Sequence, residues 1–177
     1  INRQIRDIEK LVNEFSNFAR MPNPILKRID LLKVVKVSLA FIKLTSKNAI
    51  NLINKAKNAS INGDEDQLNR VIINLIKNSE ESFLDKIEKD PDFKGNIDIE
   101  INDNNDYIII LLTDNGTGIS DAKKAMTPYF TTKKKGTGLG LPIVNKIINE
   151  HSGNISIKNK INSEGAVIKI SFPKLNA

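Results

Sequence analysis

Two apolar segments joined by a short polar turn constrain the fold of this chain most strongly. Residues 96–101 have the sequence NIDIEI and residues 107–114 the sequence YIIILLTD. Both segments are rich in the residues that favour β-strands, and the turn between them is short enough to bring them side by side as a hairpin. We therefore expect a sheet at the centre of the fold, with one of its faces buried against other elements.

The elements around this hairpin do not follow a strict strand–helix alternation. Residues 31–44 are predicted to be helical, and 64–85 form a strongly amphipathic helix that Asp64 and Gln67 begin as a capping box. The other expected elements are a strand within 47–57, a short helix from Ser120, a helix over 139–151, and strands in NISIKNK and GAVIKISF. Runs of helices and paired strands predict an α+β fold, a two-layer α/β sandwich whose mixed or mostly antiparallel sheet has helices on one face.

The first 21 residues have the spacing of a helix that packs in a bundle. Apolar residues recur at positions 1, 5, 8, 12, 15 and 19, which is the spacing of a coiled-coil seam. Leu11 and Phe18 widen this stripe beyond a two-stranded seam, and the prolines of MPNP end the helix. An ordinary amphipathic surface helix is the alternative. We favour a dimerisation helix over residues 1–22, followed by a second unit over 23–177.

Composition excludes several classes of site and partner. The 177 residues include no Cys and a single His, which rules out disulfides, thiolate metal sites and histidine-cluster metal sites. The net charge of +6 favours anionic partners, but only 5% of the residues are aromatic, so no nucleic acid is expected as a partner. No apolar segment approaches the roughly 20 residues that span a membrane. Because the chain begins with Ile, we expect it to be a piece of a longer protein.

The glycine-rich segment TTKKKGTGLGLPIV, residues 131–144, indicates anion binding. The alternating Gly136, Gly138 and Gly140 let backbone N–H groups approach an anion, and the helix that begins near Pro142 adds its N-terminal dipole. A solvated turn is the alternative. The spacing matches neither a P-loop nor the G-x-G-x-x-G fingerprint, so a nucleotide bound here would be bound in a different fold.

Two asparagines lie four residues apart on one face of the helix predicted over 64–85. Asn74 and Asn78 lie beside the apolar stripe, and Asn is an unfavourable residue in the middle of a helix. A carboxamide oxygen can complete the ligand shell of Mg²⁺, a hard cation that keeps waters and phosphate oxygens as its other ligands. Solvated amides in an Asn-rich chain are the alternative.

The strand over 107–114 ends in Asp114, which is followed by Asn-Gly. This dipeptide often forms a hairpin turn, but here a helix is predicted to follow rather than a partner strand. An Asp at this place can accept a hydrogen bond from an exocyclic amine, and Gly116 and Gly118 leave room for a flat base. The segment 126–135, MTPYFTTKKK, then puts an aromatic anchor before a basic run, which suits a lid over phosphates.

Taken in this order, the segments resemble the catalytic domain of sensor histidine kinases, in the superfamily shared with gyrase B, MutL and heat-shock chaperones. NRVIINLIKNSEES resembles the asparagine box, DNGTGI the first glycine box, and TPYFTTKKKGTGLGLPIV the phenylalanine box and second glycine box. EHSGNISI and EGAVIKISFP resemble the end of the family's domain. LVNEFSNFARMP resembles the second helix of the dimerisation and phosphotransfer hairpin in NtrY-like nitrogen-regulation kinases. The resemblance covers nearly the whole chain and implies a Bergerat-type ATPase/kinase fold.

The resemblance implies ATP and Mg²⁺ as cofactors and assigns roles to residues of this sequence. Asn78 is the implied Mg²⁺ ligand, and Asp114 is the implied acceptor for the adenine amino group. Asn74, Asn78 and Lys133 are the implied catalytic residues. The other implied nucleotide-binding residues are Gly116, Gly118, Ile119, Phe130, Thr132, Gly136, Thr137, Gly138, Leu139 and Gly140.

The resemblance also implies an activity, partners and a location. The implied activity is phosphorylation by ATP of a histidine outside this fragment, followed by transfer to an aspartate of a response regulator receiver domain. His151, at a predicted helix end, is interpreted as a structural or capping residue rather than the acceptor. We expect a homodimer in the full-length protein and a cytoplasmic fragment. We expect contact with a membrane only through upstream segments of the parent protein, an inner-membrane sensor.

Two other functions stay open on the sequence. A nucleotide-hydrolysing ATPase of the gyrase B, MutL or chaperone type would need a Glu four residues before the metal-binding Asn. This chain has Asn74 there, and a neutral amide cannot act as a general base. The other alternative is a non-catalytic dimerisation module with a dead nucleotide site, against which Asn78, Asp114 and the glycine-rich lid argue.

Overall fold

The centre of the fold is a five-stranded sheet with the strand order β2-β4-β5-β7-β6. It belongs to a computed structural model that describes residues 5, 9, 12–13, 16, 20–131 and 137–175. β2 runs parallel to β4, and the other neighbouring strands are antiparallel, so the sheet is mixed as predicted. The strands are β2 (Ala49–Asn54), β4 (Asn96–Asp103), β5 (Tyr107–Asp114), β6 (Asn154–Asn159) and β7 (Ala166–Pro173).

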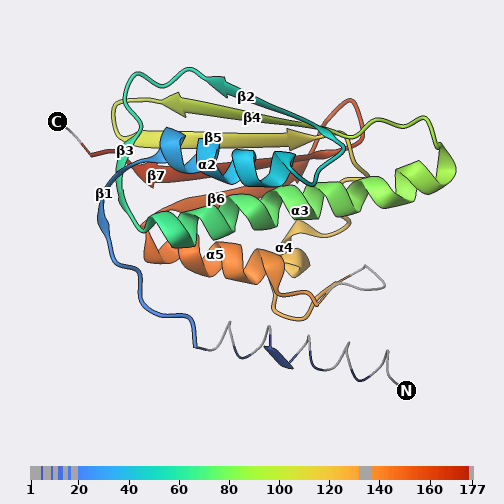
Figure 1. Cartoon of the computed structure of the whole chain (residues 1–177), viewed down its shortest axis with the longest axis horizontal. Coiled ribbons are helices and arrows are strands. Elements are labelled where there is room, and N and C mark those ends of the chain that lie inside the picture. Colours follow the sequence, from blue (N-terminus) through green and yellow to red (C-terminus); the bar gives the residue numbers. More distant parts are fainter. Residues whose placement is uncertain are drawn as a thin grey trace.

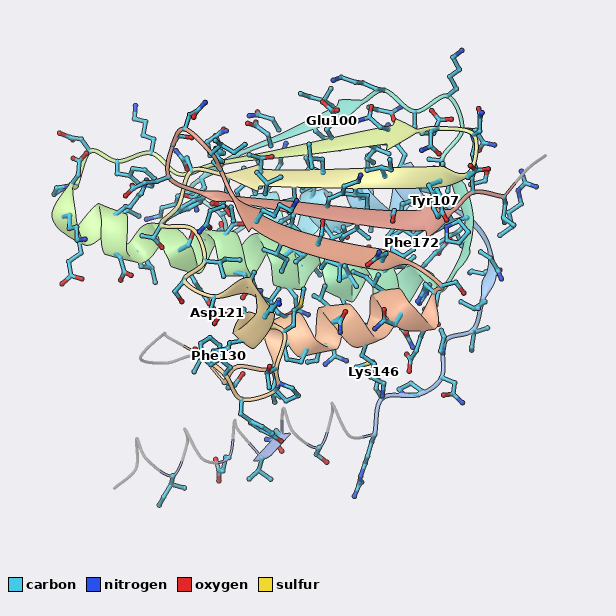
Figure 2. The ribbon with its side chains drawn as sticks, turned by 180° about the vertical axis from the view of Figure 1, so that it is seen from behind. Glu100, Tyr107, Asp121, Phe130, Lys146 and Phe172 are labelled. Atoms are coloured by element: carbon cyan, nitrogen blue, oxygen red, sulfur yellow. The ribbon has the colours of Figure 1, made fainter. Side chains whose placement is uncertain are left out.

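One face of this sheet is covered by the helices α2 (Leu31–Lys43), α3 (Glu65–Lys89) and α5 (Gly140–Glu150), with α3 between the other two (Figure 1). The strands bury alternate residues beneath them, such as Ile97 and Ile99 of β4. The residues that alternate with the buried ones, such as Glu100, belong to the opposite face and are half-buried (Figure 2). The two-layer α+β sandwich predicted from the sequence is therefore confirmed.

Helix α3 is longer than the sequence predicts. Its predicted apolar stripe is buried, with Leu75, Ile76 and Phe83 completely inaccessible. The helix continues past residue 85 to Lys89, and Lys86 and Lys89 in its last turn suit the negative end of the helix dipole. It stops at Asp90 because the next residue is Pro91, and a residue before proline avoids the helical conformation.

The sequence analysis missed a small second sheet, in which β1 (Lys27–Asp30) pairs antiparallel with β3 (Ser60–Gly63). Ile29 of β1 lies opposite Ile61 of β3, and both side chains are buried. Each strand is only four residues long, so neither carries a periodic signal of its own. Only the pairing between distant segments makes them strands.

The predicted bundle helix at the N-terminus is described at a few positions. Ile5, Glu9, Val12, Asn13 and Ser16 are all helical, and Ile5 and Val12, which belong to the predicted seam, are exposed. The other seam positions lie outside the described residues, and the division at residue 22 stays a prediction. In the ranges that the structure describes, no helix has both the length and the apolar character needed to cross a bilayer.

Asp64 and His151 fasten the N-terminus of α3. Asp64 is the N-cap, and its carboxylate accepts hydrogen bonds from the backbone N–H groups of Gln67 and Ile25. The N–H of Asp64 donates to Nε2 of His151 over 2.9 Å, and Nδ1 of the same ring lies 2.7 Å from the Ile147 carbonyl oxygen. Both ring nitrogens of this buried side chain therefore bind backbone atoms, which confirms that His151 is a structural residue.

The predicted capping box is only half right. Asp64 caps the helix, but the Gln67 side chain does not return to Asp64; its Nε2 donates to the Pro22 carbonyl oxygen over 2.9 Å. The linker before β1 thus binds the Gln67 side chain, which a capping box would direct back to Asp64. Through Pro22 and Ile25 the linker is attached to the first turn of α3 at two points.

We expect Asp64→Ala to lower the free energy of unfolding by about 1 kcal/mol at neutral pH, as for other N-cap losses. Burial raises the pKa of Asp64, but backbone N–H donors, Ile25 first, outweigh it and hold the pKa below its ordinary value of 3.8. A carboxylate with a lowered pKa stabilises the fold above the unfolded-state pKa and loses that contribution as the pH falls through the folded-state pKa. Urea unfolding should therefore show the difference between wild type and variant shrinking below about pH 4. A difference that stays constant down to about pH 2 would contradict this explanation.

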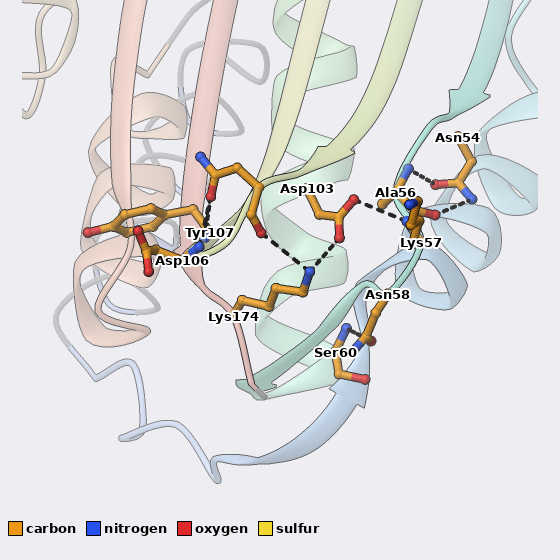
Figure 3. Close-up of polar contacts among 10 residues, drawn as sticks. Asn54, Ala56, Lys57, Asn58, Ser60, Asp103, Asp106, Tyr107 and Lys174 are labelled. Carbon is orange, nitrogen blue, oxygen red and sulfur yellow. Dashed lines mark hydrogen bonds and ion pairs between the residues drawn. The ribbon is translucent and has the colours of Figure 1, made fainter. Parts of the chain in front are cut away.

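The C-terminal end of β7 is tied to the turn between β4 and β5 (Figure 3). Lys174 forms an ion pair with Asp103, and its N–H donates to the Asp106 carbonyl oxygen over 2.8 Å. The Lys174 ammonium holds the pKa of Asp103 below its usual range. The N–H of Leu175 then donates to the Ser60 carbonyl oxygen of β3. This end of the sheet, where the chain also enters β1, is opposite the end where β5 stops at Asp114 (Figure 1).

Candidate functional site

The predicted site residues gather where α3, the end of β5 and the start of α5 meet. Asn74 and Asn78 belong to α3, and Gly140 is the first residue of α5. A Cβ added at Gly140 would lie 3.6 Å from both Oδ1 and Nδ2 of Asn78 and 3.8 Å from Oδ1 of Asn74. The amide groups of both asparagines therefore lie against the first residue of α5. Phe130 lies beside this helix start in Figure 2.

The N-terminus of α5 is suited to an anion. Leu139 occupies the N-cap position and has no polar side chain to accept a hydrogen bond from the first turn. The first N–H groups of a helix have no partner within the helix, and they favour negative charge. Asn74 leaves its oxygen toward this region because its Nδ2 donates to the Arg70 carbonyl oxygen over 2.9 Å. The start of α5 therefore brings N–H donors and the amide groups of Asn74 and Asn78 close together.

Asp114 lies at the end of β5 and is only 3% exposed. Its Oδ1 accepts hydrogen bonds from the N–H of Gly116 over 2.9 Å and the N–H of Ala166 over 3.1 Å. Its Oδ2 accepts one from the Ser79 hydroxyl over 2.9 Å. A carboxylate oxygen has two acceptor positions, so Oδ2 can accept a further donor. The carboxylate is thus held in one orientation while one of its oxygens can bind an amine.

Ser79 and Ala166 were missed by the sequence analysis. Ser79 follows Asn78 directly and is 2% exposed, four residues after the buried Leu75. A serine on the buried side of the apolar stripe was the available signal, because a buried hydroxyl needs a partner. Ala166 contributes only its backbone N–H, so no residue pattern could have indicated it.

The segment after Asp114 follows a path that requires small residues. A Cβ at Gly116 would lie 1.8 Å from the Ser82 hydroxyl, and Gly118 has a φ of +78°, in the left-handed region. Ile119 is held by Asn159, another residue that the sequence analysis missed. The glycines therefore let the chain pass close to α3 and β6. Their predicted role, to leave room for a flat base, stays a prediction.

The predicted lid is described on both sides of residues 132–136. The N–H of Tyr129 donates to the Gly138 carbonyl oxygen over 3.0 Å, which joins the two ends of the segment. Gly138 has a φ of +69°, and a Cβ there would lie 2.6 Å from the Tyr129 carbonyl carbon. The close approach at the base of the lid thus requires glycine at 138.

The other predicted residues of the lid differ in how they are placed. Phe130 and Thr137 are half-buried, whereas Leu139 is completely buried and packs in the core. Leu139 can therefore contribute to the site only through its backbone. The predicted phosphate contacts Thr132, Lys133 and Gly136 lie outside the described residues.

The side-chain oxygens at this site fit a Mg²⁺ ion that is held mainly by a bound phosphate ligand rather than by the protein. In the described parts of the chain, no group of three or more His, Cys, Asp or Glu side chains could hold a metal ion. Asn78 Oδ1 is a hard oxygen donor, and Mg²⁺ commonly takes one or two protein oxygens with waters and phosphate oxygens as its other ligands. The site therefore suits a Mg²⁺–phosphate complex better than a metal bound by protein alone.

Comparisons with known proteins agree with this geometry. The model of the family described as "Histidine kinase-, DNA gyrase B-, and HSP90-like ATPase" matches residues 63–176. The putative sensor histidine kinase NtrY-like of Rickettsia conorii is 36% identical over 175 residues, which cover 97% of this chain and 28% of that protein. The nitrogen regulation protein NtrY of Azorhizobium caulinodans is 31% identical over 174 residues, with coverage of 97% and 22%. The chain therefore spans only about a quarter of the length of these relatives.

Solved structures give the same result for the fold. The catalytic domain of the histidine kinase ThkA matches with a TM-score of 0.71 and 26% identity, over 84% of this chain and 95% of that one. Histidine kinase ThkA in complex with the response regulator protein TrrA matches with a TM-score of 0.77 and 21% identity, over 98% and 49% of the two chains.

Proposed function

The chain belongs to the family of histidine kinase-, DNA gyrase B- and HSP90-like ATPases, and from that premise we propose that it is the catalytic part of a sensor histidine kinase. In this proposal it binds ATP with Mg²⁺ and directs the γ-phosphoryl group to a histidine outside these residues. The observation that carries the proposal is the placement of Asn74 and Asn78 against the start of α5, on the same helix as the Ser79 that holds Asp114.

Each of these residues has a role in the proposal. Bound Mg-ATP would supply the phosphoryl group and the charge that neutralises it. Asp114 accepts the adenine amino group at Oδ2, where Ser79 leaves an acceptor position. Asn78 contributes its oxygen to the metal, with Asn74 beside it, and the N–H groups at the start of α5 bind the phosphates. Lys133 adds positive charge to the lid, as the family resemblance implies.

The acceptor and the partners are also part of the proposal. Because His151 is buried with both nitrogens bound to backbone atoms, it is poorly placed to receive a phosphoryl group. We place the acceptor on an upstream helix and the next acceptor on a response regulator aspartate, since ThkA has been solved with a response regulator. Residues 1–22 would complete a dimerisation hairpin in a homodimer. The fragment would act in the cytoplasm beneath a membrane-anchored sensor.

Nucleotide hydrolysis is the second candidate, because the family description includes gyrase B- and HSP90-like ATPases. It would require a base beside the attacking water. Asn74 occupies the position where those relatives are expected to carry Glu, and its amide donates to Arg70 while its oxygen faces Gly140. A neutral amide does not take a proton from water at neutral pH. The geometry therefore favours phosphoryl transfer over hydrolysis.

Labelled ATP tests the proposal directly. With γ-labelled ATP and Mg²⁺, the chain alone should bind nucleotide but take up no label, because transfer needs an acceptor in line with the γ-phosphate. Addition of a peptide with the upstream hairpin helix of the whole protein should give acid-labile label on that peptide, which then moves to a receiver domain. Label on the chain alone that disappears in a folded, ATP-binding His151→Ala variant would overturn the proposal. Release of phosphate faster than transfer would favour the second candidate.

A further inference from the structure

The hairpin of β6 and β7 holds the segment after β5 at two separate points. At the first, Asn159 accepts the N–H of Ile119 at Oδ1 over 2.7 Å and donates from Nδ2 to the Ile119 carbonyl oxygen over 2.8 Å. At the second, Glu164 pairs with Lys86 over 2.7 Å, and the Lys86 ammonium also donates to the Asn115 carbonyl oxygen over 2.8 Å. One hairpin thus fixes both ends of the segment 115–119.

Between these points the hairpin approaches the end of β5 directly. The N–H of Ala166 donates to Asp114 Oδ1, and a Cβ at Gly165 would lie 2.1 Å from the Asp114 carbonyl oxygen. Gly165 has a φ of +122°, so glycine is required there for both space and conformation. The turn is closed by the N–H of Lys160, which donates to the Gly165 carbonyl oxygen over 3.0 Å. The hairpin is therefore shaped to contact the proposed base acceptor.

We propose that Asn159 and Glu164 are positioning residues for base selection, because through Ile119 and Asn115 they hold the proposed base pocket in its binding shape before a nucleotide arrives. This inference rests on the proposed function. The segment contains Gly116 and Gly118, and glycine loses more conformational freedom on ordering than any other residue. A pocket that is ordered in advance spares the ligand that cost.

Asn159 is suited to this role because its planar amide carries both a donor and an acceptor. It is the last residue of β6, opposite Ala166 in the register with β7. From this place it bonds the backbone of Ile119 as a neighbouring strand would. An aspartate has the same shape but only acceptors, so Asn159→Asp keeps the bond from the Ile119 N–H and loses the bond to the carbonyl oxygen.

Glu164 makes the weaker of the two connections. Its side chain is 72% exposed, whereas that of Lys86 is 19% exposed and lies 5.0 Å from the centre of the Phe93 ring. The Lys86 ammonium holds the pKa of Glu164 below its usual range, so Glu164 is charged at neutral pH. Exposed ion pairs contribute little, and we expect Asn159 to dominate.

The test separates base binding from phosphate binding. Calorimetry of the 177-residue chain with Mg²⁺ should show that Asn159→Ala binds ATP about tenfold more weakly, as expected for the loss of two backbone-ordering hydrogen bonds. Its preference for ATP over GTP should fall as well, whereas its affinity for inorganic triphosphate should be unchanged. Asn159→Asp should lose about threefold and Glu164→Gln about twofold in ATP affinity. Asn162→Ala, an exposed asparagine in the same hairpin, is the matched control and should behave as wild type.

The other outcomes would overturn either the positioning role or the proposed function. If Asn159→Ala weakens ATP and triphosphate equally, or discriminates ATP from GTP as wild type does, the positioning role is overturned. If the wild-type chain binds neither ligand, the proposed function itself fails. If Asn159→Ala does not fold, the test uses Asn159→Asp, with ATP affinity and the hydrogen exchange of the Ile119 amide as the two measurements. Wild-type ATP affinity together with wild-type protection of this amide in Asn159→Asp would overturn the inference.

Discussion

Replacement of Asn78 by alanine is expected to lower the affinity for Mg-ATP by about 10- to 100-fold. Its amide group lies against the start of α5, where the proposed Mg²⁺ and phosphates would lie. Loss of a hydrogen bond or ligand to a charged group costs about 1.5–3 kcal/mol. Alanine is a better helix former than asparagine, so α3 itself should not be weakened. Titration calorimetry with ATP in excess Mg²⁺ measures the effect.

Two comparisons make this result specific. Lys77→Ala changes the exposed neighbour of Asn78 on the same helix and should leave the affinity unchanged. In EDTA the gap between wild type and Asn78→Ala should narrow, because the proposed contact acts through the metal. Wild-type affinity of Asn78→Ala in Mg²⁺ would rule out the assignment of this residue.

Asp114→Asn is expected to remove the preference for ATP over GTP. The carboxylate accepts from an exocyclic amine in the proposal, whereas an amide can also donate to the carbonyl group of guanine. The NH₂ group of the new amide would face either Ser79 or the N–H groups of Gly116 and Ala166, all of which donate to the carboxylate in the wild type. The free energy of unfolding should therefore fall by about 1–3 kcal/mol. Calorimetry with both nucleotides and urea unfolding measure the two effects.

Asp98→Asn provides the matched control for Asp114→Asn. Asp98 lies on β4, and its partly exposed carboxylate accepts hydrogen bonds from Asn51 and Asn96. Its replacement should change neither nucleotide preference nor stability by a comparable amount. If Asp114→Asn still distinguishes ATP from GTP as well as wild type does, Asp114 does not bind the adenine amino group.

The parts of the fold that could be predicted are those with a strong local pattern. The amphipathic stripe of α3 and the alternation in β4 and β5 predict the bounds of these elements to within a few residues of the observed ones. By contrast, β1 and β3 are four-residue segments whose strand character comes from their mutual pairing. The Gln67 side chain was assigned to the cap of its own helix, but the linker carbonyl at Pro22 binds it instead. Tertiary contacts decided each of these cases.

The same division applies to the candidate site. Asn74, Asn78, Asp114 and the glycines were predicted because their side chains, or the lack of one, carry the chemistry. Ser79 and Asn159 were not predicted, since their hydrogen-bond partners are 35 and 40 residues away in the sequence. Thr132, Lys133 and Gly136 stay predictions, because they lie outside the described residues.

The attachment of the incoming linker to α3 has a mechanical consequence. Pro22 and Ile25 bind the first turn of this helix, and Asn78 lies about 20 Å further along the same rod. An unbroken helix does not bend easily, and α3 is packed between α2 and α5, so a rotation at the linker would move these elements together. A rotation of about 5° at the linker would move Asn78 through about 2 Å relative to the proposed upstream acceptor helix. Misplacement by about 1 Å can change a transfer rate by about 10²-fold. If the chain transfers a phosphoryl group as proposed, a small rotation at the linker would therefore be enough to engage or disengage that transfer.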